Sequence, residues 1–308
     1  MEEKTGSERE ERFVRQQYGQ VGKHAVCKVC SWTKRAIRGE GHCYKHYFYG
    51  ISTGKCLEMS PILICNQRCK HCWRDQSLFA KEMEDVDDPE EIIEGCIKAR
   101  RQLLIGFKGN ENVDQEKVEE FLIPKQAAIS LTGEPCLYPK LPELIEKFYE
   151  KSFDSVFLVT NGTVPEMVKR VVELNRPPTN IYLSVEAWDK DNYKEFCKPL
   201  EEGQWEKIQE TMNILRESGQ TTVLRITCVK GFNMDDSNKF KWVLEKMRPT
   251  HVECKGYMFV GYSRKRLQQE NMPLHEEVKE FAERLAEISG YKLKGEQEES
   301  RVVLLSRE

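Results

Sequence analysis

The stretch Cys65-Asn66-Gln67-Arg68-Cys69-Lys70-His71-Cys72-Trp73 places three cysteines within eight residues. Thiolates at this spacing can bind three irons of a [4Fe-4S] cube, and the fourth iron stays open for another ligand. Seven of the twelve cysteines fall between positions 27 and 72, which concentrates metal-binding chemistry in this part of the chain. The stretch therefore predicts an iron–sulfur centre whose open iron can bind and reduce a small molecule.

The cysteine stretch follows a short apolar run, and five similar runs occur further along the chain. Short runs of this kind, rich in Val, Ile and Leu, predict strands over 61–64, 127–131, 155–159, 180–185, 221–229 and 251–259. Between them, apolar residues recur every three or four positions, which predicts helices over 90–104, 141–151, 166–174, 204–218, 236–247 and 274–289. Six strand–helix units imply parallel strands with right-handed crossovers, so the expected fold class is α/β, a partial (β/α)6 barrel.

Three regions are expected along the chain. Residues 1–60 are predicted to form an N-terminal cysteine-rich extension, residues 61–290 the partial barrel, and residues 291–308 a C-terminal tail. Both termini are charged and are expected to have little order, and 106–115 is predicted to be a loop.

Polar residues follow the predicted strands at the end where a parallel barrel places its active site. The turn Thr132-Gly133-Glu134-Pro135 follows the second strand, Asn161 follows the third, Ser184 and Glu186 end the fourth, and Lys230-Gly231 ends the fifth. Glycines at such positions let the backbone approach a ligand, and the polar side chains supply directed contacts.

A second set of cysteines lies in the extension. Cys30, Cys43 and Cys56 are separated by twelve residues each time, and Lys45 comes two residues after the middle one. These three thiolates can also hold a cube with one open iron, but spacing alone equally fits buried thiols or zinc ligands. The other cysteines, Cys96, Cys136, Cys197, Cys228 and Cys254, lack ligand spacing and are expected to be small buried residues.

Charge is unevenly distributed in a chain whose formal net charge is -3. Between Lys23 and His46 there are six Lys or Arg residues and a single acid, so Lys34, Arg35 and Arg38 are candidates for phosphate contacts. The run Tyr262-Ser263-Arg264-Lys265-Arg266 is a second candidate. Both runs also fit a solvated surface. The eight acids of segment 82–94 are expected to keep polyanions away.

No apolar stretch approaches the length of a membrane span, and the N-terminus lacks the apolar core of a signal peptide. The protein is therefore expected in the cytoplasm without a membrane partner. Thiols stay reduced in that compartment, so metal binding is favoured over disulfides.

The cysteine stretch and the Thr132–Glu134 turn resemble the radical S-adenosylmethionine (SAM) superfamily, whose signature is Cys-x3-Cys-x-aromatic-Cys. His71 occupies the aromatic position, and Thr132 stands where the family has the first glycine of a Gly-Gly-Glu turn. The resemblance implies that Cys65, Cys69 and Cys72 hold the SAM cluster, and that Thr132, Gly133 and Glu134 bind the methionyl amino group. It assigns further SAM contacts to Asn161, Ser184, Glu186 and Arg225.

The sequence motifs around the second set of cysteines resemble those of one family within this superfamily, the 4-demethylwyosine synthases. These motifs are Cys30-Ser31-Trp32-Thr33-Lys34, Cys43-Tyr44-Lys45, Phe48-Tyr49-Gly50-Ile51, Cys56 and Cys72-Trp73-Arg74. The later segments Ser130–Pro135, Thr160–Thr163 and Arg225–Thr227 also fit this family. The resemblance covers nearly the whole chain. Since residues 1–22 are too few for the flavodoxin-like domain of the eukaryotic relatives, the archaeal architecture is expected, with an external electron donor of the ferredoxin or flavodoxin type.

The resemblance implies the following reaction. An adenosyl radical formed from SAM takes hydrogen from the N-methyl group of 1-methylguanosine, next to the anticodon of tRNA-Phe. The resulting carbon radical attacks the carbonyl of pyruvate, and the carboxylate carbon is lost. Cys30, Cys43 and Cys56 would hold a second [4Fe-4S] cluster that binds pyruvate. A monomer is expected.

Lys45 is the candidate catalytic residue, as a Schiff base with pyruvate or as a proton carrier. The ordinary pKa of lysine is about 10.4, so a nucleophilic role requires desolvation or a neighbouring cation. A role as a plain cation that binds phosphate or carboxylate stays open.

Two other classes of protein are considered. A radical SAM enzyme acting on a protein or a small metabolite has no need of the basic patch or of Lys45. A zinc-bearing RNA-binding module, with Cys27-x2-Cys30 paired to Cys69-x2-Cys72, has no need of the Thr132–Pro135 turn and leaves Cys65 unused.

Overall fold

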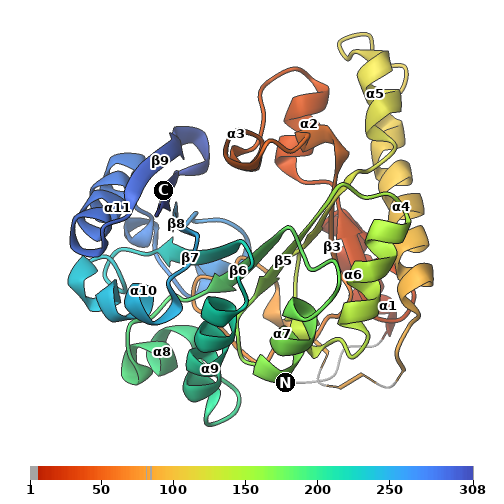
Figure 1. Ribbon diagram of the computed structural model, residues 1–308. Helices are drawn as coiled ribbons and strands as arrows, with labels where there is room; N and C mark the ends of the chain where they lie inside the picture. The colour runs from red at the N-terminus through yellow and green to blue at the C-terminus, as the bar shows by residue number, and fades with distance from the viewer. Residues whose placement is uncertain (1–5, 81, 84, 308) are drawn as a thin grey trace. The chain divides into compact units, whose positions relative to one another are not determined.

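The chain forms two compact units in the computed structural model, which describes residues 6–80, 82–83 and 85–307 (Figure 1). The first unit comprises residues 1–64 and 78–158, and the second comprises residues 65–77 and 159–308. The cysteine stretch therefore packs with the second unit, whereas the two chain segments that flank it belong to the first.

In its described residues, the first unit is built on five strands. They are β1 (Tyr18–Val21), β2 (Ala25–Lys28), β3 (Cys56–Ser60), β4 (Gln126–Ile129) and β5 (Ser155–Thr160), the last two residues of which belong to the second unit. β1, β2 and β3 pair antiparallel in that order, and β3, β4 and β5 pair parallel. The N-terminal extension thus adds two strands to the first strand of the barrel instead of forming a separate body.

The described residues of the first unit form six α-helices: α1 (Gly6–Arg15), α2 (Ser31–Ile37), α3 (Tyr44–Tyr49), α4 (Pro89–Leu104), α5 (Gln115–Phe121) and α6 (Leu141–Glu150). α4 packs on β1, β2 and β3 and against α6. It begins at Asp88, whose carboxylate accepts a hydrogen bond from Glu90 N, and it buries Ile92, Ile93 and Cys96 on one face. The 3-10 turn Thr53–Lys55 leads directly into β3.

Up to residue 307, the second unit contains the strands β6 (Asn180–Ser184), β7 (Thr222–Cys228), β8 (His251–Gly256), β9 (Lys292–Gln297) and β10 (Val302–Ser306). β6, β7 and β8 are parallel, and β10 lies antiparallel between β8 and β9. The helices are α7 (Pro165–Val172), α8 (Lys190–Cys197), α9 (Gln204–Glu217), α10 (Lys241–Met247) and α11 (His275–Ser289). α11 packs on β8 and β10.

The predicted fold class is confirmed: the six strands β3 to β8 alternate with helices and pair parallel within each unit. The six predicted helices are present, most of them within two residues of their expected bounds, although the range 236–247 divides into a 3-10 turn (Ser237–Phe240) and α10. The cysteines expected to be small buried residues are all buried. No helix in the described part of the chain is long and apolar enough to cross a membrane.

Three expectations are wrong. The first barrel strand is Cys56–Ser60 and not 61–64, because Pro61 has no N–H to donate to a sheet. The C-terminal segment 291–308 is not a tail of little order: it contains β9 and β10, and Val302 to Leu305 are fully buried. Near the N-terminus, residues 6–15 form α1, while residues 1–5 lie outside the described residues.

Candidate active site

The cysteine loop, residues 65–77, begins five residues after β3 ends. Its three cysteines are half-buried, and none forms a disulfide. The loop curls on itself, because Cys72 N donates to Cys69 O at 3.3 Å and Arg68 Nη1 donates to Cys65 O at 2.6 Å. Gln76 Nε2 adds a bond to Cys69 O at 2.9 Å. Three reduced thiols on one curled loop are the donor set that an iron–sulfur cube requires.

The first half of the cysteine loop is bound along its backbone by the segment that ends α8. Arg68 N donates to Cys197 O at 3.1 Å, and Lys70 N donates to Phe196 O at 2.9 Å. Leu200 N in turn donates to Asn66 O at 3.0 Å. The thiol of Cys197 faces that of Cys69, and this contact together with burial raises the pKa of Cys69. Sequence spacing gave no sign that Cys197 lies beside Cys69.

His71 is held in the site by stacking and burial. Its ring stacks on Phe196 at a centroid distance of 5.0 Å, and its Nε2 lies 3.6 Å from Glu186 Oε1. Burial, with Arg266 and Arg74 nearby, lowers the pKa of His71 to about 3, so the ring is neutral. Its Nδ1 is buried and has no hydrogen-bond partner among the described residues. A buried, unsatisfied ring nitrogen beside the thiols fits a site that binds a polar ligand such as SAM.

Glu186 is buried at 6% exposure, two residues after β6 ends. Burial raises its pKa to about 7, although its carboxylate accepts hydrogen bonds from both N and Oγ1 of Thr227. These bonds fix the carboxylate beside His71, as expected of a residue that orients a bound cofactor.

The Thr132–Glu134 turn depends on glycine at its centre. Gly133 has φ +68, and a Cβ there would lie 2.5 Å from Ile62 O and 2.7 Å from Ile64 O. Glu134 N donates to Ile64 O at 2.7 Å, and Thr132 N donates to Ser60 Oγ at 2.6 Å. The turn is thus packed against the segment that leads into the cysteine loop, which only a glycine permits.

The remaining predicted SAM contacts differ in their surroundings. Asn161 Nδ2 donates to Asn66 Oδ1 at 3.0 Å, which brings Asn161 next to the cysteine loop. Ser184 is half-buried at the end of β6. Arg225 is bound to the buried Glu253 at 2.8 Å and lies over the Tyr182 ring at 4.5 Å. A carboxylate of a ligand would therefore have to share the Arg225 guanidinium with Glu253.

The second set of thiols comes together in the first unit, at the amino-terminal end of β3. Cys30 begins α2 and accepts a hydrogen bond from Thr33 N at 3.3 Å, while Cys43 begins α3. The hydroxyl of Thr33 joins Cys30 Sγ (3.3 Å) to Thr53 O (3.2 Å), and Thr53 Oγ1 contacts both N and Sγ of Cys43. Two buried threonines thus connect the two cysteines, a role that the sequence did not indicate.

Cys56 and Lys45 complete this group. Burial, together with the nearby Glu58 and Cys43, raises the pKa of Cys30 to about 11. Burial and the neighbouring Cys30 also raise the pKa of Cys56, whereas Lys45 lowers it. Lys45 Nζ lies 4.5 Å above the ring of Phe157 on β5. Half-buried thiols that resist ionisation without a counter-charge fit a site that a metal cluster completes.

Cys27 does not belong to this group. It is fully buried in β2, and its Sγ contacts Cys96 O at 3.5 Å. The zinc pairing of Cys27 with Cys30 considered above is therefore not formed. No three His, Cys, Asp or Glu side chains in the described ranges are placed to hold one metal ion between them.

Arg100 supports the second group from α4. Its side chain is 1% exposed and donates to the carbonyls of Gly54, Cys56 and Phe121. We expect Arg100→Met to lower the free energy of unfolding of the cluster-free protein by about 3 kcal/mol, because three buried carbonyls lose their donors. Urea unfolding measures this change. Arg101→Met, one residue on and exposed, is the control and should change it by no more than about 0.5 kcal/mol; an equal loss in both variants would contradict the assignment.

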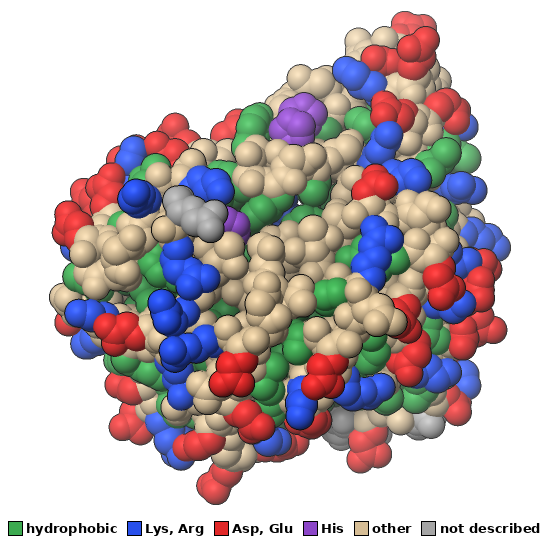
Figure 2. Space-filling model, viewed as in Figure 1, with side chains coloured by type: hydrophobic (Ala, Val, Ile, Leu, Met, Phe, Trp, Pro, Cys, Tyr) green, Lys and Arg blue, Asp and Glu red, His purple; other side chains and the backbone are tan. Residues whose placement is uncertain are grey.

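The Lys and Arg residues predicted to contact RNA lie in both units. Lys34 donates to Gln17 at 2.6 Å, Arg35 to Glu40 O at 3.0 Å, and Arg38 binds the Glu40 carboxylate through two nitrogens. Arg264 and Lys265 are exposed, whereas Arg266 is half-buried and turned toward the cysteine loop. Figure 2 shows acidic side chains at the outer end of α5, where Glu111, Asp114 and Glu116 are exposed. That end is unsuited to RNA.

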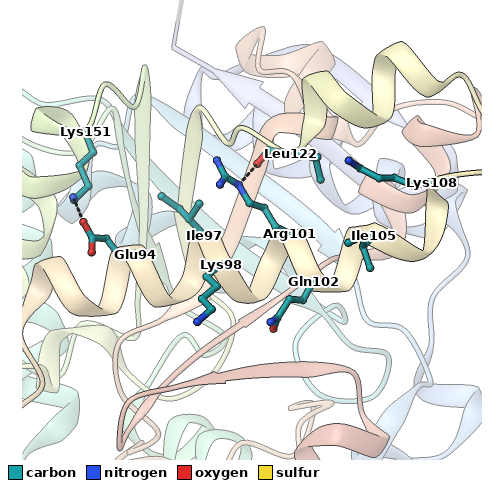
Figure 3. Close-up of a pocket in the computed structure, with 9 residues that line it drawn as sticks. All are labelled: Glu94, Ile97, Lys98, Arg101, Gln102, Ile105, Lys108, Leu122 and Lys151. Carbon is teal, nitrogen blue, oxygen red and sulfur yellow. Dashed lines mark hydrogen bonds and ion pairs between the residues drawn. The ribbon is translucent and has the colours of Figure 1, made fainter.

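A pocket of about 550 Å³ lies on the outer face of α4, away from its Arg100 side. Figure 3 shows Ile97, Arg101 and Ile105 along the helix, with Leu122 and Lys108 beside them and Lys151 bound to Glu94 at 2.8 Å. The pocket has no thiol and none of the predicted site residues. It is therefore not part of either cysteine site.

Two protein-family models match this chain. The model of the Radical SAM superfamily matches residues 59–242, and that of wyosine base formation matches residues 246–307. The chain is a radical SAM enzyme, which implies SAM and a [4Fe-4S] cluster, and Cys65, Cys69 and Cys72 provide a donor set that fits this cluster.

Related sequences and solved structures identify the family within this superfamily. The chain is 44% identical to the S-adenosyl-L-methionine-dependent tRNA 4-demethylwyosine synthase of Pyrococcus abyssi, over 96% of this chain and 87% of that protein. Two solved structures are similar. "Structure of TYW1 with a lysine-pyruvate adduct bound" has TM-score 0.89 and 34% identity over 98% and 96% of the two chains, and "Crystal structure of archaeal TYW1" has 0.81 and 32% over 99% and 97%. The chain belongs to the tRNA 4-demethylwyosine synthase family. This membership excludes the zinc-bearing, non-enzymatic alternative.

Proposed function

We propose that this enzyme condenses 1-methylguanosine, next to the anticodon of tRNA-Phe, with a two-carbon unit of pyruvate to form the tricyclic base 4-demethylwyosine. The observation that supports this substrate pair is the gathering of Cys30, Cys43, Cys56 and Lys45 in one place. A radical SAM enzyme that needed SAM alone would have no use for a second set of half-buried thiols with a lysine beside it. The similar structure with a lysine–pyruvate adduct supports the same assignment.

Each set of residues has a separate task in this proposal. Cys65, Cys69 and Cys72 hold the cluster that binds SAM, and together these groups supply a radical able to abstract hydrogen when an electron arrives. SAM is oriented by the turn Thr132-Gly133-Glu134 and by four further residues: Asn161, Ser184, Glu186 and Arg225. Cys30, Cys43 and Cys56 hold a second [4Fe-4S] cluster whose open iron binds pyruvate.

Lys45 acts on pyruvate in this proposal. Its amine condenses with the keto carbon and releases water, so that the resulting imine carbon is held in place for attack by a carbon radical. The alternative is that its ammonium group only binds the carboxylate. The position of Lys45 beside the thiols, over the buried Phe157 ring, favours an active-site role over a contact with surface phosphate.

The tRNA is proposed to contact basic residues of both units: Lys34, Arg35 and Arg38 at the end of α2 in the first unit, and Arg264 and Lys265 on an exposed turn of the second. Arg266, the third basic residue of the run expected to contact RNA, is not included, because its guanidinium is already bound to backbone carbonyls of the cysteine loop. An external ferredoxin or flavodoxin supplies the electron, and we propose a cytoplasmic monomer.

Iron and sulfide content per chain after anaerobic reconstitution tests the proposal. We expect about eight irons in the unaltered protein and about four in a triple Cys65, Cys69, Cys72→Ala variant, with Mössbauer spectra of cubes in both. About four and none would show that Cys30, Cys43 and Cys56 hold no cluster. The enzyme would then need another site for pyruvate.

A further inference from the structure

The second half of the cysteine loop is held by a different part of the chain from the first half. The 3-10 turn Gly261–Lys265 and the following Arg266, which we call the basic turn, contact residues 70–73. Arg266 Nε donates to Lys70 O at 3.2 Å, and its Nη2 donates to Cys72 O. One guanidinium thus binds the carbonyls on both sides of His71, so the curvature of the loop at a cluster ligand depends on it.

The basic turn also meets the cysteine loop through its backbone. Tyr262 N donates to Trp73 O at 2.9 Å. Gly261 has φ +59, and a Cβ at this position would overlap with Trp73 O. Only a glycine allows the two backbones to approach this closely. The turn and the loop therefore move together or must separate completely.

The basic turn is rigid at its centre and charged on its outside. Ser263 is fully buried, and its hydroxyl bonds to Tyr257 Oη at 2.8 Å and to Val260 O at 2.6 Å. Arg264 and Lys265 are exposed, and Lys265 Nζ lies 4.8 Å above the Tyr262 ring. Two cations beside a half-exposed aromatic ring can bind a phosphate and a base of RNA. The side chain next in sequence is the one that binds the cysteine loop.

The two segments that support the cysteine loop lie in different family matches. The segment that binds the first half of the loop, residues 193–204, lies inside the match to the Radical SAM superfamily, which ends at residue 242. The basic turn lies inside the match to wyosine base formation, residues 246–307. Half of the cysteine loop is therefore supported by the general fold and half by a segment particular to this family.

We propose that the basic turn couples RNA binding to the geometry of the SAM-cluster loop, with Arg266 as the positioning residue that makes the link. Binding of RNA phosphates to Arg264 and Lys265 fixes the turn, and the fixed turn holds the carbonyls of Lys70 and Cys72. This inference rests on the proposed function, because it takes tRNA as the ligand of the turn.

Hydrogen–deuterium exchange of the amides of residues 69–74 tests the link without measuring turnover. The experiment uses the full chain with and without its clusters, and a saturating transcript of tRNA-Phe. In the unaltered protein we expect tRNA to slow exchange in this segment by about fivefold. In Arg266→Lys, which keeps the charge but loses the paired donors, tRNA should still bind within about twofold of its original affinity, and the slowing should disappear.

Two further variants complete the design. Arg264→Ala/Lys265→Ala removes only exposed side chains, so its folding is not in question; we expect about tenfold weaker tRNA binding at low salt and no slowing at saturation. Arg216→Lys, on the exposed side of α9, is the matched control and should behave like the unaltered protein. In the cluster-loaded protein, Arg266→Lys should also change the electron paramagnetic resonance spectrum of the reduced cluster with SAM bound.

The outcomes separate the inference from the proposed function. If tRNA binds the unaltered protein and slows exchange equally in Arg266→Lys, or in the double variant at saturation, the coupling is wrong and the proposed function stands. If tRNA binds but never slows exchange in residues 69–74, the coupling is again wrong. If tRNA does not bind the unaltered protein at all, both fail.

Discussion

Cys69→Ala is expected to abolish reductive cleavage of SAM, down to the background of the cluster-free protein. Cys69 is the middle one of the three proposed cluster ligands, and alanine removes its thiolate while keeping the backbone carbonyl that accepts from Cys72 N and Gln76. Two remaining thiolates cannot hold a cube with one defined open iron. The measurement is 5'-deoxyadenosine produced by the reconstituted enzyme with dithionite.

The thiol next to Cys69 provides a matched control. Cys197 faces Cys69 but lies on α8 and is not assigned as a ligand, so Cys197→Ala should retain SAM cleavage. Cys43→Ala provides the complementary variant: we expect abortive SAM cleavage to persist while formation of the tricyclic base stops. Loss of SAM cleavage to the same extent in Cys43→Ala and Cys69→Ala would overturn the division of tasks between the two sets of thiols.

Lys45→Arg is expected to eliminate formation of 4-demethylwyosine while leaving abortive SAM cleavage intact. Arginine keeps the positive charge and can still stack on the Phe157 ring, but its guanidinium does not form a Schiff base at neutral pH. Two measurements check this: the modified nucleoside in digested tRNA, and the covalent adduct trapped on the protein by reduction in the presence of pyruvate.

Lys28→Arg is the control for this substitution. Lys28 also belongs to the first unit and lies over an aromatic ring, that of Tyr18 at 4.6 Å, but the proposal assigns it no contact with pyruvate. It should retain full product formation. Full product formation in Lys45→Arg as well would leave Lys45 as a plain cation and remove the Schiff base from the proposal.

The sequence predicted those parts of the fold whose pattern is local. Helices such as α4 and α6 have an apolar face and a Pro or Asp at the start, and the cysteine loop has a spacing that carries its chemistry by itself. The first barrel strand was misplaced because its true residues, Cys56 to Ser60, include Glu58, which breaks the apolar run. β10 was missed because charged residues surround its four buried apolar residues.

The supporting residues of the site could not be predicted, because their importance arises from contacts across long stretches of chain. Arg100 looks like any helical arginine until its three carbonyl partners are known, and Thr33 and Thr53 become connectors only when α2 lies beside the turn before β3. Arg266 was expected to face RNA with Arg264 and Lys265. The structure turns it inward, since a 3-10 turn directs successive side chains to different sides.

The order of strands at the end of the second unit has a consequence for how the protein reaches its folded state. β10 follows β9 in the sequence but lies between β9 and β8, so β9 has no neighbour in the sheet until β10 is present. The two are joined by a short turn, and such hairpins form within microseconds, long before distant strands meet. β9 and β10 are therefore expected to join the edge of β8 as one preassembled hairpin, and not as two successive strands.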